Sequence, residues 1–269
     1  MKKYKKRDQF KEEKWKYPFS IVPIFATPVA GYQLDHKQYN KHLDKVVDKT
    51  PVSEYPAVHG GVTAYDPKIA KEHRENMHIL GDKALEPLLG EIQDCVDHYM
   101  EKVGFKPAAI VSSWFNILEK DGYVDAHRHK HSYLSGCYYH TCPEGSSPFQ
   151  LHDPKAGILN MNKNKPTAKL KRGKEERIVD VEGYWHREKF TAYTYEWTDV
   201  PVNSGLLFLF PSYLGHRVKP CKDLKEGEQR INFSFNCIAK EHLEDYTKWA
   251  KKHFYDKELD HTKCDERNQ

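Results

Sequence analysis

The spacing of hydrophobic residues changes near residue 105 of this chain of 269 residues, and that change limits the folds open to it. Up to about residue 104, apolar residues recur at helical spacing, over 35–48 and again over 68–103. Beyond residue 106 they form short runs separated by Gly, Pro, Asp and Asn, as is typical of β-strands. These runs are Ala109–Leu118, Tyr133–His140, Phe149–His152, Phe190–Trp197, Gly205–Phe210 and Arg230–Ile238. The sequence therefore predicts a mainly β protein with helices (α+β), in which N-terminal helices support a jelly-roll or cupin-like barrel.

The same segmentation predicts one domain between two flanking segments. Residues 1–18 are charged throughout and lack the apolar stretch of a signal peptide, so we expect a solvated basic arm. Residues 19–239 form the domain, with Phe19–Tyr32 as an edge strand, helical support over 35–104 and the β core over 107–239. Within the core, 155–200 is too long for a simple connection and forms either a lid or a solvated insertion with its own hairpin. Residues 240–269 are expected to form a C-terminal helix and tail.

Composition excludes several classes of protein. The formal charge of +4 arises from 43 basic and 39 acidic residues, which is not the strong field of a dedicated nucleic-acid binder. The six cysteines include no CxxC pair, so neither a zinc ribbon nor a thioredoxin-like motif is indicated, and a reducing, cytoplasmic setting fits. No run reaches membrane-spanning length, and we expect no membrane partner. The sequence does not specify an oligomeric state.

Metal chemistry is suggested by four potential ligands at every second position, Asp125, His127, His129 and His131. On an extended strand these side chains share one face, so two of the imidazoles can bind one ion if a distant strand supplies a third ligand. The alternative is that the run is only the solvated face of a strand. We expect His131 to leave the cluster, because it leads into the next segment.

A second group of residues favours the metal interpretation. The apolar run Leu206–Phe210 leads through a Pro-containing corner to His216, and a further strand then begins with Arg230. His216 can supply the third nitrogen ligand. A guanidinium in a mostly apolar barrel needs a carboxylate partner, which its planar fork matches well.

These residues carry a family resemblance. The segments HRHKHSYLSGCYYH, FQLHDP, VNSGLLFLFPSYLGH and RINFSFN resemble the 2-oxoglutarate and iron(II) oxygenases related to prolyl hydroxylases, most closely a putative-oxygenase branch of marine bacteria and phages. The resemblance extends over residues 19–239 and implies a double-stranded β-helix. It also implies that His127 and His216 bind the metal, that Arg230 binds the distal carboxylate of 2-oxoglutarate, and that Tyr139 donates a hydrogen bond to the same carboxylate.

The third metal ligand is where this sequence departs from the wider superfamily, which mostly places Asp or Glu two residues after the first histidine. Here that position is His129. Either the centre has three histidines, or it takes a carboxylate from Asp125 or Asp153. For Asp125 we favour a role as acceptor for an imidazole N–H, and for Asp153 a turn before Pro154.

The resemblance implies an enzyme that uses iron(II), 2-oxoglutarate and dioxygen to hydroxylate a C–H bond of a peptide or small molecule, with release of succinate and CO₂. Trp114 and Asn116 either line its pocket or fill the core. The alternatives are a non-catalytic, cupin-like metal-binding or sensor protein, and a purely structural jelly-roll. Arg230 distinguishes them, because an oxygenase needs this charge buried beside the metal, whereas a structural barrel places it at the surface or in an internal salt bridge.

Overall fold

The computed structural model describes residues 26–65, 78–129, 132–154, 167–172, 175–180, 197–245 and 248. Its helices are α1 (Asn40–Lys49) and α3 (Glu86–Val103), with 3-10 turns η1 (His36–Gln38), η3 (Ile79–Gly81), η4 (Lys83–Leu85) and η5 (Lys240–His242). Its strands are β1 (Ala30–Gln33), β2 (Ser53–Tyr55), β3 (Val58–Thr63), β4 (Ala108–His127), β5 (Leu134–Thr141), β6 (Phe149–His152), β7 (Thr167–Arg172), β8 (Glu175–Asp180), β9 (Trp197–Val200), β10 (Leu206–Pro211), β11 (His216–Val218) and β12 (Arg230–Ala239).

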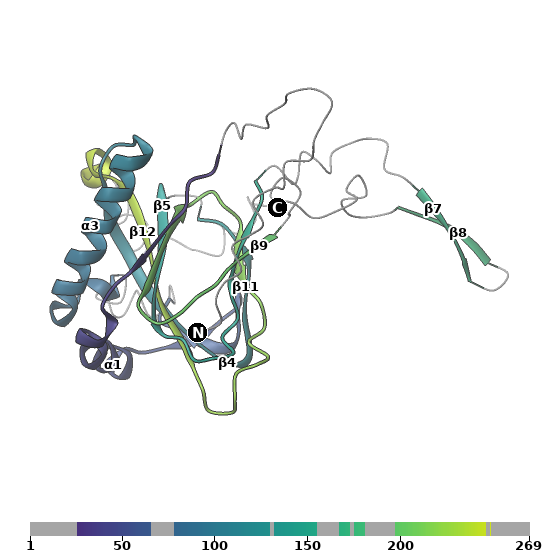
Figure 1. Ribbon diagram of the computed structural model, residues 1–269, viewed down its shortest axis with the longest axis horizontal. Helices are drawn as coiled ribbons and strands as arrows, with labels where there is room; N and C mark the ends of the chain where they lie inside the picture. The colour runs from purple at the N-terminus through teal and green to yellow at the C-terminus, as the bar shows by residue number, and fades with distance from the viewer. Residues whose placement is uncertain are drawn as a thin grey trace, which may run out of the picture.

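One long strand, β4, joins the two halves of the barrel (Figure 1). Its first part, as far as Leu118, pairs with β12, and its last residues pair with β11. The strand order is therefore β1-β10-β5-β12-β4 in one half-sheet and β4-β11-β6-β9 in the other. From β4 onward the chain passes back and forth between the halves, which is the winding of a double-stranded β-helix. The predicted fold class is confirmed.

Two apolar clusters hold these layers together. The outer cluster packs α1 and α3 against the larger half-sheet and includes Leu43, Leu88, Ile92, Val96, Tyr138 and Phe233. The inner cluster lies between the half-sheets and includes Tyr139, Phe149, Phe208, Phe210 and Val218. Successive residues of a strand point to opposite faces, so Tyr138 and Tyr139 belong to different clusters. Only Tyr139 faces the barrel interior.

The helices are shorter than the hydrophobic spacing predicts. Asp35 caps the turn η1 rather than α1, and its carboxylate accepts a hydrogen bond from the Lys37 backbone N–H. The helix expected from residue 68 begins only at Glu86; residues 79–85 form 3-10 turns, and 66–77 lie outside the described residues. Asp82 explains the later start, because its side chain accepts from the Ala84 backbone N–H and closes η4. Pro87 then occupies the first turn of α3, where its missing N–H costs nothing.

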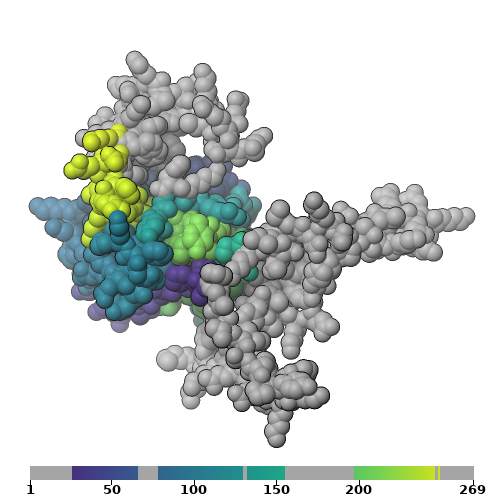
Figure 2. Space-filling view, turned by 90° about the horizontal axis from the view of Figure 1, so that it is seen from above, coloured from purple at the N-terminus to yellow at the C-terminus, as the bar shows by residue number. Residues whose placement is uncertain are grey.

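The flanking segments are only partly described. In the segment expected as an edge strand, β1 lies at the edge of the sheet and pairs with β10, while residues 19–25 are outside the described ranges. In the 155–200 insertion, β7 and β8 pair as a separate hairpin and β9 pairs with β6 in the barrel. The basic arm and most of the C-terminal segment lie outside the described residues. The described start of the C-terminal segment, yellow in Figure 2, lies beside α3, where Nζ of Lys240 donates to the Asp97 carboxylate at 3.2 Å. Among the helices that are described, none has the length and apolar character needed to cross a membrane.

Close strand packing at Gly136 gives a stability test. A Cβ added there would lie 2.2 Å from Cζ of Phe235 and 2.8 Å from Cδ2 of Leu209. We expect Gly136→Ala to lower the free energy of unfolding by about 1–3 kcal/mol, as measured by urea denaturation. The control is Gly90→Ala in α3, where an added Cβ meets nothing within 4 Å. That change should be neutral or stabilise by about 0.5–1 kcal/mol. Equal unfolding midpoints for Gly136→Ala and the wild type would contradict this account of the packing.

Candidate metal centre

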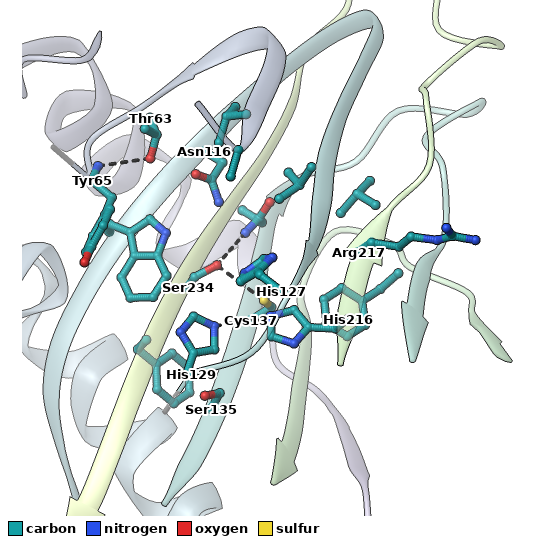
Figure 3. A pocket seen from close by; sticks show the side chains of 18 of the residues that line it. Thr63, Tyr65, Asn116, His127, His129, Ser135, Cys137, His216, Arg217 and Ser234 are labelled. Carbon is teal, nitrogen blue, oxygen red and sulfur yellow. Dashed lines mark hydrogen bonds between the residues drawn. The ribbon is translucent and has the colours of Figure 1, made fainter. Parts of the chain in front are cut away.

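A cavity of about 300 Å³ opens between the two half-sheets. Side chains from β2, β3, β4, β5, β6, β10, β11 and β12 line it (Figure 3). Because strands from both halves contribute, residues far apart in the sequence face one another across this space.

Three histidines meet on one wall of the cavity. His127 ends β4 and His216 begins β11, and their Cα atoms are direct register partners, so the ring centroids lie 4.2 Å apart. His129 follows the end of the strand and is held to the barrel because its backbone N–H donates to the Ser212 carbonyl at 3.2 Å. Its ring centroid lies 5.2 Å from that of His127 and 5.0 Å from that of His216. One nitrogen from each ring lies within 4.8 Å of the other two.

Backbone hydrogen bonds orient two of these rings. Nδ1 of His127 lies 2.7 Å from the Asp125 carbonyl oxygen, and Nδ1 of His216 lies 2.9 Å from that of Leu214. A carbonyl only accepts, so each Nδ1 carries the proton and each Nε2 presents a lone pair. Nε2 of His216 lies 3.2 Å from Nε2 of His129. Two nitrogens bound at about 2.1 Å in neighbouring positions on one ion lie about 3 Å apart, so this spacing suits a shared metal.

Burial keeps the three rings in the form that binds metals. It lowers the pKa of His127, and the pKa of His129 falls to about 3 because of burial and the proximity of His127. Burial also holds the pKa of His216 well below its usual range. At neutral pH the cluster therefore offers three uncharged imidazole nitrogens, which are ligands that suit iron, zinc, nickel and copper.

The alternative carboxylates lie away from this cluster. The Asp125 carboxylate lies 2.9 Å from Nε2 of His59, so the acceptor for the His127 N–H is the backbone carbonyl of Asp125 and not its side chain. Within the described ranges, neither Asp125 nor Asp153 joins the group of close metal-ligating atoms, while His129 does. His131, expected to leave the cluster, is outside the described residues.

Arg230, at the start of β12, is fully buried and lines the same cavity. Its Nη1 donates to Oδ1 of Asn232 at 3.0 Å, and its guanidinium lies 5.0 Å from the centre of the Tyr139 ring. Among the described residues, Nε and Nη2 of Arg230 and the hydroxyl of Tyr139 have no hydrogen-bond partner. Burial raises the pKa of Tyr139, so its hydroxyl keeps the proton and can donate. These three donors together fit one carboxylate, which offers acceptors only.

Other polar residues of this wall were not identified from the sequence. Asn232, Ser234 and Asn236 face the cavity from β12. Nδ2 of Asn232 donates to Oγ of Ser234 at 2.9 Å, and Oγ of Ser135 donates to Oδ1 of Asn236 at 2.8 Å. The signal was present in RINFSFN, where polar and apolar residues alternate with the period of a strand. A barrel interior lined with polar side chains indicates a binding cavity more than a packed core.

A comparison with protein families agrees with this geometry. Residues 112–236 match the model of a family described as putative 2OG-Fe(II) oxygenase, a segment that begins within β4 and ends within β12. It therefore includes all three histidines, Tyr139 and Arg230. The resemblance to 2-oxoglutarate- and iron(II)-dependent oxygenases inferred from the motifs is confirmed over this segment. Iron(II), 2-oxoglutarate and dioxygen are the cofactor and cosubstrates of this enzyme class.

Several solved structures are similar to this chain at low sequence identity. The non-heme α-ketoglutarate-dependent epimerase SnoN from nogalamycin biosynthesis is 10% identical with a TM-score of 0.49, covering 79% of this chain and 78% of its own. A Pseudomonas putida prolyl-4-hydroxylase is 11% identical with a TM-score of 0.44, covering 78% and 92%. HygX from Streptomyces hygroscopicus, with nickel, 2-oxoglutarate and hygromycin B bound, is 13% identical with a TM-score of 0.42, covering 80% and 84%. A comparison with curated proteins finds no similar sequence.

The identity of the third ligand can be tested by metal affinity. We expect His127→Ala, His129→Ala and His216→Ala each to weaken anaerobic binding of iron(II) at least about 100-fold, more than the loss of a supporting contact causes. Competition with a chelator measures this effect. Asp125→Asn and Asp153→Asn are the controls and should bind iron(II) as the wild type does. If Asp153→Asn loses the metal while His129→Ala retains it, the third ligand is a carboxylate.

Proposed function

We propose that His127, His129 and His216 hold iron(II) and that Arg230 and Tyr139 anchor 2-oxoglutarate in the same cavity. The observation that carries this proposal is the full burial of Arg230 with two unpaired donor nitrogens, beside a cluster of three neutral imidazoles. An internal salt bridge would have favoured a structural barrel, but within the described part of the chain Arg230 forms no ion pair.

The guanidinium has a fixed orientation, which suits an anchoring role. Asn232 binds Nη1, and the Tyr139 ring lies against the cationic group. The remaining donors are then preorganised for the distal carboxylate of 2-oxoglutarate, so that binding needs little rearrangement. A charge-assisted, two-point contact of this kind is stronger than an ordinary hydrogen bond.

Aromatic rings pack against the metal side of the cavity. The ring of His216 stacks on Phe149 with centroids 5.4 Å apart and contacts Phe210 at 4.9 Å. These rings keep the imidazole in place and exclude water from one side of the centre. The chemistry that iron(II) and 2-oxoglutarate supply when bound is oxidation of a substrate by dioxygen, with release of succinate and CO₂.

For the outcome of the reaction we propose hydroxylation of a C–H bond in a peptide or small molecule. A cavity of about 300 Å³ must hold both the cosubstrate and the reacting part of the substrate, so only a side chain or a small group can enter it. The cytoplasmic location, the domain boundaries and a role of residues 155–200 as a lid remain predictions from the sequence.

Anaerobic titration tests the proposal. Iron(II) and 2-oxoglutarate bound together should give a weak metal-to-ligand charge-transfer band in the visible. We expect Arg230→Ala to raise the dissociation constant of 2-oxoglutarate roughly 30-fold or more, because a desolvated charge contact is lost. Tyr139→Phe should raise it about three- to tenfold, the effect of one hydrogen bond.

The matched control is Arg217→Ala. This arginine also lines the cavity, but its Nε donates to Gln150 at 2.8 Å and its guanidinium lies 3.9 Å from the Trp197 ring centre. We expect it to leave 2-oxoglutarate affinity nearly unchanged. If iron(II) binds to the wild type and no concentration of 2-oxoglutarate produces the band, the proposal is wrong and a non-catalytic metal-binding barrel is the better interpretation.

A further inference from the structure

One part of the cavity wall serves neither the metal nor the cosubstrate in this scheme. Trp114 and Asn116 lie two residues apart on β4, on the face where they oppose Ser234 and Asn232 of β12. Both line the cavity, and both are buried, with 9% and 8% of their surface exposed. Figure 3 shows the Asn116 side chain directed into the cavity, between Thr63 and His127.

The polar groups of these two residues have no partner in the described part of the chain. No hydrogen bond involves the Asn116 carboxamide or the Trp114 indole N–H, although the neighbouring Asn232 is fully engaged by Arg230 and Ser234. Neither group is among the fully enclosed side-chain atoms that lack a partner, so both open onto the cavity, where a ligand can form hydrogen bonds with them. The Asn116 carboxamide can both donate and accept, so its complement also needs a donor and an acceptor.

An aromatic wall leads from this position to the metal centre. The centroid of the Trp114 ring lies 5.7 Å from that of His129 and 5.1 Å from that of Tyr65, and Tyr65 lies 5.5 Å from Tyr55. Flat or apolar carbon skeletons pack well against such a surface. A group held against Trp114 would therefore lie directly beside a proposed iron ligand.

The charges around the cavity select against ionic groups at this wall. No aspartate or glutamate lines the cavity among the described residues, so a cation has no counter-ion there. Of the arginines, Arg230 faces the cosubstrate, Arg217 is bound to Gln150 and Trp197, and Arg128 is exposed. No arginine is therefore both buried and free to pair with a second anion.

We infer that Trp114 and Asn116 form the subsite that positions the substrate to be oxidised, and that they select an uncharged amide group on a flat or apolar carbon skeleton. The amide oxygen accepts from Nδ2 of Asn116, its N–H donates to Oδ1, and the skeleton packs against Trp114 beside His129. This inference rests on the proposed function, because it assigns to the substrate the wall that iron(II) and 2-oxoglutarate leave free.

Calorimetric titration of the zinc-loaded protein with saturating 2-oxoglutarate tests the subsite without turnover, because zinc is redox-inert. The probes are benzamide, benzoate and benzylamine, which share a ring and differ in the charge of the attached group. We expect benzamide to bind at least tenfold more tightly than the other two. Asn116→Ala should weaken benzamide binding about three- to tenfold, the loss of one or two hydrogen bonds. Asn116→Asp should reverse the preference, so that benzylamine binds more tightly than benzamide.

Ser112→Ala is the matched control, because Ser112 precedes Trp114 by two residues on β4 and is not among the residues that line the cavity. It should bind benzamide as the wild type does. The inference would be overturned by equal affinities for benzamide and benzoate, or by an Asn116→Ala variant that binds benzamide as the wild type does. If the zinc-loaded protein still bound 2-oxoglutarate, the proposed function would stand. Absence of 2-oxoglutarate binding by the zinc-loaded wild type would instead count against the proposed function itself.

Discussion

The cavity in the barrel interior depends on one physical constraint, the full burial of the positive charge of Arg230. Transfer of a guanidinium out of water costs several kcal/mol unless its donors are paired. In the described part of the chain only Asn232 binds it, and Tyr139 places a further unpaired donor close by. The folded chain therefore has an excess of buried hydrogen-bond donors at this site, and an anion with two acceptor oxygens can pair with them. Because β12 lies between β4 and β5, the backbone at Arg230 is fixed at one end of a central strand.

The metal centre depends on the same long strand. β4 pairs with β12 through its first part and with β11 through its last residues, so one element sets the positions of Arg230 and of the histidines. His127 and His216 are direct register partners, and a slip of one residue would turn one imidazole to the opposite face. Strand pairing therefore brings Arg230 and the three histidines into one cavity.

Much of this arrangement could be predicted from the sequence, and the failures have physical causes. The alternation of His127 and His129 and the placement of His216 and Arg230 at strand starts predicted a shared site, since side-chain direction in a strand follows from local spacing. The end of β4 at His127 could not be predicted, because it depends on the short partner β11. The helix expected over residues 79–85 was wrong, because Asp82 caps a turn there and tertiary packing, more than periodicity, decides where α3 begins. For Trp114 and Asn116 the sequence left both core packing and pocket lining open, and the pairing of β4 with β12 places them on the cavity wall.

The most direct test of the central claim is a crystal structure of the protein grown or soaked without oxygen in iron(II) and 2-oxoglutarate, with diffraction recorded at the iron absorption edge. The account predicts one anomalous peak about 2.1 Å from a ring nitrogen of each of His127, His129 and His216. It also predicts a carboxylate of 2-oxoglutarate bound to Nε and Nη2 of Arg230 and to the Tyr139 hydroxyl. An iron ion bound elsewhere, or an Arg230 side chain paired with a carboxylate of the protein while 2-oxoglutarate is absent from the cavity, would contradict it.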